Sequence, residues 1–288
     1  MKKIFCLFFF FITGVLCAQP SPWETVAPDG SPIYTDIKDA ARSASAAYRL
    51  QVDGTEMLLD KKQLARIPAL TSLMALRLNN NGVTQLPSPF LSLKTLVYFS
   101  STGNPLLTLP DSIGMWSNLK FMELQQTAFD TLPEGIYGLS RLQSLMINAN
   151  SDTLCFTRSV KSFSKNLSEL RLYNTVLDTL PEEFSQLVQV RKLVMYKCSL
   201  TEIPPQVYAL STLSELWLDS NNLTMIPPAI SQMQGLTYLS LRGNRITKVT
   251  SSICFLKNLV VLDLRGNPID PYEINVVQAL LPNCRILF

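Results

Sequence analysis

Residues 213–227 read LSELWLDSNNLTMIP, and most of the chain repeats the spacing of Leu, Asn and Pro in this stretch. The spacing is L-x-x-L-x-L-x-x-N-x-L-x-x-I-P, and it returns along the sequence after about residue 47. Successive copies are 23 residues apart (for example 244 − 221) within two groups, and an irregular turn with Asn150 joins the groups. A fixed period of this length indicates a solenoid of stacked repeats. The residues at the Asn position are Asn81, Asn104, Thr127, Thr175, Cys198, Asn221, Asn244 and Asn267.

The apolar residues of this repeat are spaced so that all of them can point into one core. Leu216 and Leu218 alternate with other residues, as in a short strand with one buried face. Leu213, Leu223 and Ile226 supply apolar side chains at the remaining turns of the coil. Burial becomes complete only between neighbouring coils, so we expect the coils to be stable only as a stack.

The Asn of the repeat is predicted to lie inside the turn that follows the strand. A buried amide must be hydrogen bonded, and Asn221 offers two donors and one acceptor. Stacked at one repeat spacing, such side chains can bond backbone groups of the coils above and below. Pro227 then closes the turn, where no backbone N–H is required.

These residues resemble the leucine-rich repeat family, in the form found in secreted bacterial proteins, and the match covers most of the chain after about residue 47. The resemblance implies an α/β repeat solenoid: an arc with one short parallel strand per coil on its concave side and a cap at each end. Members of the family typically bind proteins on the concave face. The resemblance therefore implies protein recognition rather than catalysis.

The N-terminus has the form of a secretory signal peptide. Residues 1–18 carry Lys2 and Lys3 before an apolar run that is too short to span a membrane. Cleavage is predicted after Ala18, and the protein is expected to be exported to the periplasm, the cell surface or the medium. The alternative is a lipoprotein anchored at Cys17, although Leu16 stands where a small residue is preferred.

The rest of the chain divides into a lead-in, the repeats and a terminal segment. Residues 19–46 are a Pro-rich lead-in with a helix expected from Asp36, and residues 47–267 are repeats. Leu50 and Val52 are preferred for the first strand, with 58–66 as an extra loop; Met57 and Leu59 are the alternative. The coil at 142–166 is longer by two residues and irregular between 151 and 166. Residues 268–288 are expected to form a C-terminal cap with a helix and a last strand.

The composition offers no ordinary catalytic or metal centre. The chain contains no His, which excludes a Ser-His-Asp triad, and we expect no enzyme activity, cofactor or metal. Removing residues 1–18 leaves 23 basic residues (25 − 2) against 22 acidic ones, so no nucleic-acid partner is expected. No later stretch is long and apolar enough to span a membrane, and a monomer is expected. The four remaining Cys are predicted to be free thiols: Cys155, Cys198, Cys254 and Cys284.

The residues between the strand leucines are predicted to face outward on the concave side. Ala75, Tyr98 and Phe121 begin one such column, and the aromatic residues of later coils lie on four successive strands. Tyr, Trp and Arg are over-represented among interface hot spots, whereas β-propensity alone would also favour aromatic residues here. The candidate ligand-binding residues are Arg171, Tyr173, Lys192, Tyr196, Glu215, Trp217, Asp219, Tyr238 and Arg242.

The sequence therefore favours a non-enzymatic module that binds a protein on the concave face of the arc. One alternative is a surface adhesin or structural protein of the cell envelope, for which Cys17 would be the anchor. A second is an effector with enzymatic activity, which is disfavoured because the repeats leave no residues for an enzyme domain. If the aromatic residues are not the site, the irregular segment 151–166 is the next candidate.

Overall fold

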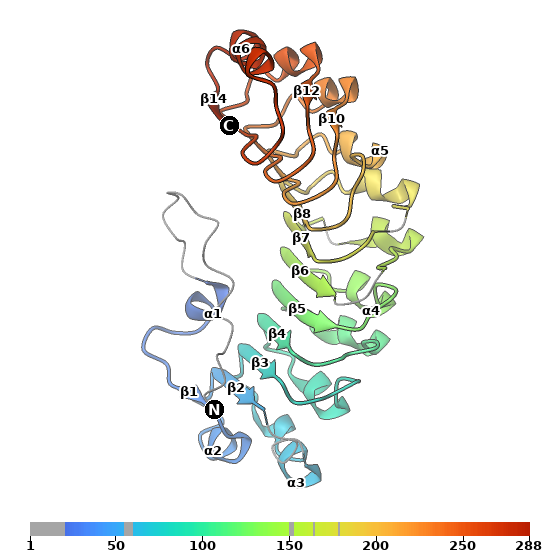
Figure 1. The fold of residues 1–288 in the computed structure, drawn as a ribbon. Helices are drawn as coiled ribbons and strands as arrows, with labels where there is room; N and C mark the ends of the chain where they lie inside the picture. Colours follow the sequence, from blue (N-terminus) through green and yellow to red (C-terminus); the bar gives the residue numbers. More distant parts are fainter. Residues whose placement is uncertain (1–20, 55–59, 150–152, 164, 178) are drawn as a thin grey trace, which may run out of the picture.

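The computed structural model describes residues 21–54, 60–149, 153–163, 165–177 and 179–288. Within these residues the chain forms a curved solenoid whose coils share one parallel sheet of 12 strands (Figure 1). The α/β repeat solenoid predicted from the sequence is therefore confirmed. The proposed signal peptide at 1–18, the alternative first strand at Met57 and Leu59, and Asn150 lie outside the described residues.

The strands lie on the concave side of the arc, and short helices lie on its convex side (Figure 1). The strands follow one another across the sheet in chain order, because each coil returns the chain to the edge of the previous strand. A separate pair, β10 (Met225–Ile226) and β12 (Lys248–Val249), joins two coils away from this sheet. The sheet contains β1 (Ile33–Tyr34), β2 (Arg49–Asp53), β3 (Ala75–Asn79), β4 (Tyr98–Thr102), β5 (Phe121–Thr127), β6 (Ser144–Ala149), β7 (Glu169–Tyr173), β8 (Lys192–Tyr196), β9 (Glu215–Trp217), β11 (Tyr238–Ser240), β13 (Val261–Asp263) and β14 (Arg285–Leu287).

Most helical turns on the convex side begin directly after the Pro of the repeat. Pro fixes φ and needs no partner for an N–H, which suits the residue before a helix. Thr157 and Thr250 replace this Pro in two coils and cap the turn with their hydroxyl groups. The turns are α3 (Lys61–Leu64), η2 (Ile67–Ala69), η3 (Ser88–Ser92), η4 (Asp111–Met115), α4 (Glu134–Tyr137), η5 (Arg158–Ser162), η6 (Glu182–Gln186), α5 (Pro205–Tyr208), η7 (Pro228–Gln232) and η8 (Ser251–Phe255).

The pairing of the strands agrees with the register read from the sequence. Leu50 pairs with Leu76, so the preferred first strand is confirmed and its coil contains three extra residues (76 − 50 = 26). Part of the expected extra loop is helical, because Asp60 accepts from the backbone N–H of Gln63 and starts α3. Leu145 pairs with Leu170, 25 residues later, so this coil is two residues longer than the 23-residue period, as predicted.

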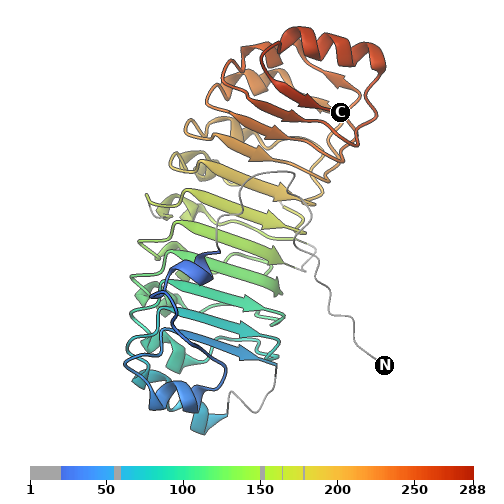
Figure 2. The same ribbon diagram turned by 90° about the vertical axis from the view of Figure 1, so that its left-hand side faces the viewer.

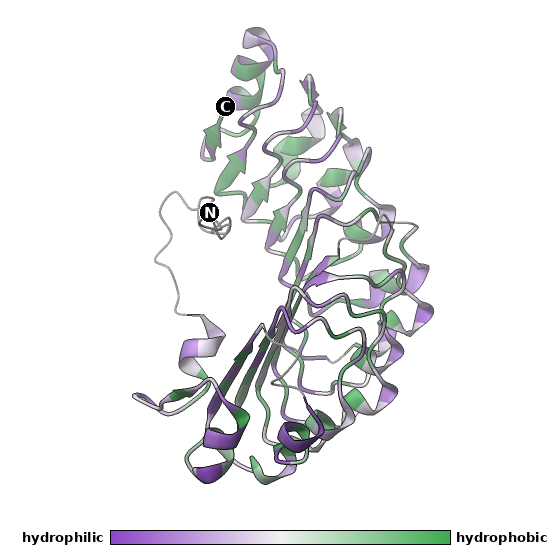
Figure 3. Cartoon of the chain, turned by 60° about the horizontal axis from the view of Figure 1, so that its bottom comes forward, coloured by the Kyte–Doolittle hydropathy of each residue, from purple (hydrophilic) through white to green (hydrophobic). Residues whose placement is uncertain are grey.

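A single apolar core runs through the stack from the first coil to the last. The inward leucines of the strands and the apolar residues of the convex turns are buried together, and hydrophobic and hydrophilic residues alternate along the coils (Figure 3). Trp116 belongs to this core: its ring meets that of Phe99 edge-on at 4.9 Å, and its Nε1 donates to the carbonyl of Phe90. The core explains why the coils are stable as a stack.

Each end of the solenoid carries a helix that the sequence predicted. Asp36 caps α2 (Ile37–Arg42) by accepting from two backbone N–H groups, as expected. At the other end, α6 (Pro271–Leu280) is followed by β14, so the expected helix and last strand are both present. Val277 of α6 is buried against the core.

The buried Asn side chains form the expected ladder between coils. Asn104 is fully buried; its Oδ1 accepts from the N–H of Asn81 at 2.8 Å, and its Nδ2 donates to the carbonyl of Leu78 at 2.9 Å. Asn244 donates in the same way to the carbonyl of Leu218 at 2.9 Å. Each side chain therefore satisfies backbone groups of a neighbouring coil that no strand partner reaches.

Cys198 occupies a ladder position and bonds its neighbours only weakly. Its Sγ lies 3.5 Å from the carbonyl oxygen of Leu172. We expect Cys198→Asn to raise the free energy of unfolding by about 1 kcal/mol, because an amide could donate to Leu172 and accept from the N–H of Thr175. Urea denaturation measures the difference. Cys254→Asn, in η8 and away from the ladder, is the matched control; a gain at both positions would contradict the ladder argument.

The four thiols lie in different environments. Cys198 is buried, whereas Cys155, Cys254 and Cys284 are partly exposed. None of these four, all within the described residues, forms a disulfide. Cys254 lies on the convex side in η8, whereas Cys284 precedes β14 and packs against the core.

Candidate functional site

Four aromatic side chains line the concave face on four neighbouring strands of the sheet. Tyr173 and Tyr196, on β7 and β8, are partners in the register, and their ring centroids are 6.1 Å apart. Trp217 and Tyr238, on β9 and β11, stack with centroids 4.3 Å apart and an interplanar angle of 22°. All four are partly exposed. We call these four residues the aromatic patch; the structure brings them together in two pairs.

Charged side chains beside the aromatic patch are linked in a row across three strands. Lys192 lies 3.1 Å from Glu215 and 3.8 Å from Glu169, and Arg171 lies 2.6 Å from Glu169. The Nζ of Lys192 is also 5.4 Å from the ring of Trp217, whose Nε1 donates to Glu215 at 3.3 Å. These contacts hold the side chains in place while leaving them partly exposed. The patch is therefore preorganised and close to neutral in charge.

Glu169 is a member of this row that the candidate residues did not include. It occupies the outward column of β7, and the register pairs it with Lys192. Its carboxylate accepts from the Nε of Arg171 at 2.8 Å and contacts both cations. The signal was present in the sequence, because residues opposite one another on parallel strands at this spacing are neighbours. Glu169 precedes Lys192 by one repeat (192 − 169 = 23), and it completes the alternation of negative and positive charges along the row.

Asp219 was predicted to be part of the exposed concave surface, and this prediction is wrong. The side chain is 4% exposed and accepts from the hydroxyl of Ser240 and from the backbone N–H of Arg242. It lies just beyond β9, and its donors come from the next coil: Ser240 at the end of β11 and Arg242 in the turn that follows. Burial raises the pKa of Asp219 to about 6. Arg242 itself is exposed, as expected.

The raised pKa of Asp219 predicts a pH-dependent stability. The folded protein holds the proton more tightly than the unfolded chain, whose Asp has a pKa of 3.8, so the charged carboxylate destabilises the fold above about pH 6. We expect Asp219→Asn to increase the free energy of unfolding by about 1–3 kcal/mol at pH 7.5. The difference should shrink as the pH falls through 6 towards 4. Thermal unfolding of both proteins at these pH values measures it, and a difference independent of pH would contradict the assignment.

Another part of the concave face is covered by the chain itself. The short helix α1 (Pro22–Thr25) lies over the concave side of the sheet (Figure 2), and Trp23 packs on Ala75 and Tyr98. Both residues were predicted to face outward, but Ala75 is fully buried and Tyr98 is 1% exposed. The expectation that they are exposed is wrong because the lead-in folds back over β3 and β4. The open concave surface therefore lies further along the solenoid.

The irregular coil supplies core contacts on the convex side. Phe156 meets Phe184 edge-on at 5.7 Å, and Phe163 meets Tyr137 at 4.8 Å. The hydroxyl of Tyr137 accepts from the backbone N–H of Thr157 at 3.3 Å. In the described part of this segment, the large aromatic side chains therefore pack inward instead of forming an outer surface.

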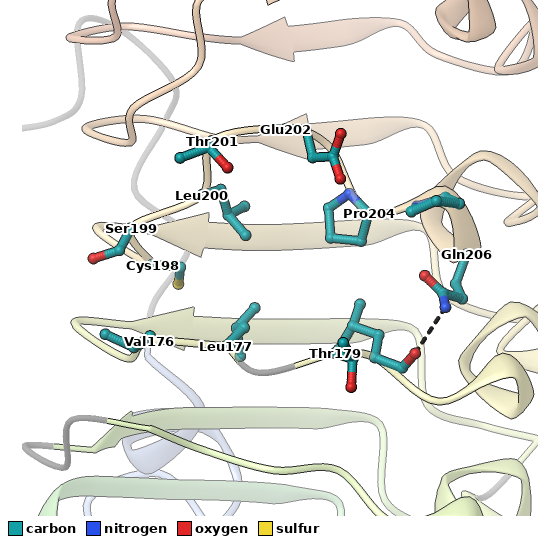
Figure 4. Close-up of a pocket in the computed structure, with 12 residues that line it drawn as sticks. Val176, Leu177, Thr179, Cys198, Ser199, Leu200, Thr201, Glu202, Pro204 and Gln206 are labelled. Atoms are coloured by element: carbon teal, nitrogen blue, oxygen red, sulfur yellow. Dashed lines mark hydrogen bonds between the residues drawn. The ribbon is translucent and has the colours of Figure 1, made fainter.

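A cavity of about 340 Å³ opens on the flank of the solenoid, away from the concave face (Figure 4). It lies where the chain returns from β7 and β8 to the convex turns. Cys198 and Leu200 form part of its lining, and the Nε2 of Gln206 donates to the carbonyl of Leu180 at 2.7 Å across one end. The cavity contains no cluster of charged groups and is separate from the aromatic patch.

Over the described residues, no group of three His, Cys, Asp or Glu side chains is placed to hold a metal ion. In the same part of the chain, no helix combines the length and apolar character needed to cross a membrane.

Comparison with known proteins connects the repeat to a family. The family model described as "Leucine rich repeat" matches residues 211–269. Among curated protein sequences, none matches this chain.

Solved structures show the same fold over most of the chain. The leucine-rich repeat domain of the type III effector XopL has a TM-score of 0.62 and 22% identity, over 97% of this chain and 97% of that one. An internalin, InlF from Listeria monocytogenes, has a TM-score of 0.57 and 17% identity, over 95% and 92%. The Arabidopsis receptor kinase HAESA, solved with a peptide hormone and a co-receptor, has a TM-score of 0.55 and 27% identity. That match covers 71% of this chain and 36% of HAESA.

The repeat spacing, the buried Asn ladder and the single parallel sheet agree with these matches. Solenoids of this kind use their extended concave surfaces for binding, and the fold commonly mediates contacts between proteins. The chain therefore has the leucine-rich repeat fold, and its residues 211–269 match the leucine-rich repeat family model.

Proposed function

We propose that this protein is an exported, monomeric recognition module without enzyme activity, which binds a protein ligand at the aromatic patch. The observation that carries the proposal is the stacking of Trp217 on Tyr238 next to the pair formed by Tyr173 and Tyr196, all partly exposed on the concave face. Large apolar rings at an outward position do not contribute to the core. A contiguous group of them on neighbouring coils is typical of a binding surface.

The contacts around the patch support strong binding. Trp, Tyr and Arg dominate interface hot spots, and rigid side chains lose little entropy when a ligand binds. Lys192 and Arg171 already have carboxylate partners, which hold them beside the rings. A ligand would therefore meet a preformed surface of aromatic rings with charged groups at its rim.

The similarity to HAESA supports a peptide or an extended protein segment as the ligand. HAESA was solved in complex with the peptide hormone IDA. An extended segment could cross several strands of the concave face and contact both ring pairs. A protein ligand of this shape would need only the surface between β7 and β11.

Quantitative capture tests this function. Immobilised wild-type protein, Tyr238→Ala and Tyr272→Ala are exposed to extracts of the organism and its surroundings, and bound proteins are quantified by mass spectrometry. Tyr272 is the matched control because it is 76% exposed on α6, away from the patch. We expect the same specific protein with wild type and Tyr272→Ala, and its loss with Tyr238→Ala. Equal capture by all three proteins would place the binding site elsewhere.

A further inference from the structure

We propose that the concave face carries a second binding site, a receptor for a Trp side chain, which Trp23 of the same chain occupies. Ala75, Arg77 and Tyr98 form this site, and a Trp-bearing segment of a partner protein can displace Trp23 from it. The inference goes beyond the function proposed above, because this site lies on β3 and β4 and shares no residue with the aromatic patch.

The walls of the site match an indole ring. Trp23 is 4% exposed and meets Tyr98 edge-on, with centroids 5.7 Å apart and an interplanar angle of 62°. The guanidinium carbon of Arg77 lies 4.1 Å from the centre of the Trp23 ring and 5.7 Å from that of Tyr98. Such cation–π contacts strengthen when the cation is shielded from water. The hydroxyl of Tyr98 donates to Glu123 at 2.8 Å, which fixes the orientation of this wall.

The site does not depend on Trp23 for its shape. Trp23, Ala75 and Tyr98 form a small apolar cluster that is separate from the continuous core of the solenoid. Arg77 and Tyr98 are presented by strands whose inward leucines and Phe99 are held in that core. When Trp23 leaves, the strands and the walls they carry should therefore remain in place.

Besides Trp23, the segment is held by Val26, which packs against the same cluster, by the buried Ala27, and by hydrogen bonds from Arg49. The side chain of Arg49 donates to the carbonyls of Glu24 at 3.3 Å and Pro28 at 3.5 Å. The Nε of the same Arg49 is buried without a partner, which is a cost that release of the segment would remove. The next firm attachment is β1, whose Ile33 pairs with Arg49. Trp23 therefore occupies the site as part of the same chain, ten residues (33 − 23) before the strand β1 that attaches the segment to the sheet.

Tethering makes Trp23 a competitor for any other ligand of the site. A short flexible tether gives an effective concentration on the order of millimolar. A free segment with modest affinity therefore cannot enter the site in the wild-type protein. A partner that brings a Trp-bearing segment and additional contacts can, and it would also expose the concave face over β3 and β4.

A labelled peptide tests this proposal directly. The probe is a fluorescent peptide with the sequence of residues 21–31, and the readout is anisotropy on titration with the full chain. We expect saturable binding to the Trp23→Ala protein and at least about tenfold weaker binding to wild type, because tethered Trp23 competes. Trp23→Phe should be intermediate. Arg77→Ala in the Trp23→Ala background should weaken binding about tenfold, and a peptide with Ala in place of Trp should not bind.

Circular dichroism and thermal unfolding establish that each variant is folded. Equal affinity of the peptide for wild type and Trp23→Ala would overturn the proposal, since the peptide would then bind elsewhere. Absence of binding to a folded Trp23→Ala protein would also overturn it. Unfolding of Trp23→Ala would do the same, because the site would then depend on its own occupant.

Discussion

Replacing Asn221 with Ala is expected to lower the free energy of unfolding by about 3–5 kcal/mol. The Oδ1 of Asn221 accepts from the N–H groups of Cys198 at 2.8 Å and Leu200 at 3.1 Å. Its Nδ2 donates to the carbonyls of Met195 at 2.7 Å and Leu218 at 2.9 Å. The substitution leaves these buried groups without partners, and each lost partner costs about 1–3 kcal/mol before water or local movement compensates.

Asn222→Ala is the matched control for this prediction. Asn222 is adjacent and partly exposed, and only its backbone N–H is bonded, to the carbonyl of Leu200. We expect a change within about 0.5 kcal/mol. Urea denaturation measures both variants, and hydrogen exchange shows whether the loss is centred on the coils of β8 and β9. Equal losses at Asn221 and Asn222 would show that the ladder does not stabilise the stack.

Replacing Trp217 with Ala is expected to weaken binding of the captured ligand by about thirtyfold or more. Truncation of an aromatic anchor commonly costs 2 kcal/mol or more of binding free energy, which corresponds to this factor. Trp217 stacks on Tyr238 and bonds Glu215, so its loss also releases two neighbours from their fixed positions. Isothermal titration calorimetry with the purified ligand measures the affinity.

The fold should survive this substitution, in contrast to a substitution in the core. Trp217 is partly exposed, so the free energy of unfolding should change by about 1 kcal/mol or less. Trp116 is fully buried, and Trp116→Ala is expected to cost about 3–5 kcal/mol and to unfold the coils around it. Undiminished binding by a double variant, Trp217→Ala with Tyr196→Ala, would refute the aromatic patch as the site.

The repeat spacing was sufficient to predict the architecture. Side chains at Leu216 and Leu218 can only be buried if every coil places a strand at the same point, so the register of the sheet follows from the period. The same reasoning placed Asn221 in the ladder. Contacts between neighbouring coils can be predicted from the sequence because the partner of each residue lies about one period away in the chain.

Which side chains of the concave face are exposed was decided by contacts that do not recur in every coil, so the repeat pattern could not predict it. Tyr98 and Ala75 are covered by Trp23, which belongs to the lead-in and has no counterpart in the repeats. Asp219 is buried beside Ser240 at the end of β11 and Arg242 in the following turn, which supply donors for its carboxylate, although its position in the pattern is outward. The pairing of Trp217 with Tyr238 depends on side-chain rotamers across two strands. A repeat pattern specifies which way a side chain points, whereas what lies over it is decided by packing of non-repeated segments and by the path of each turn.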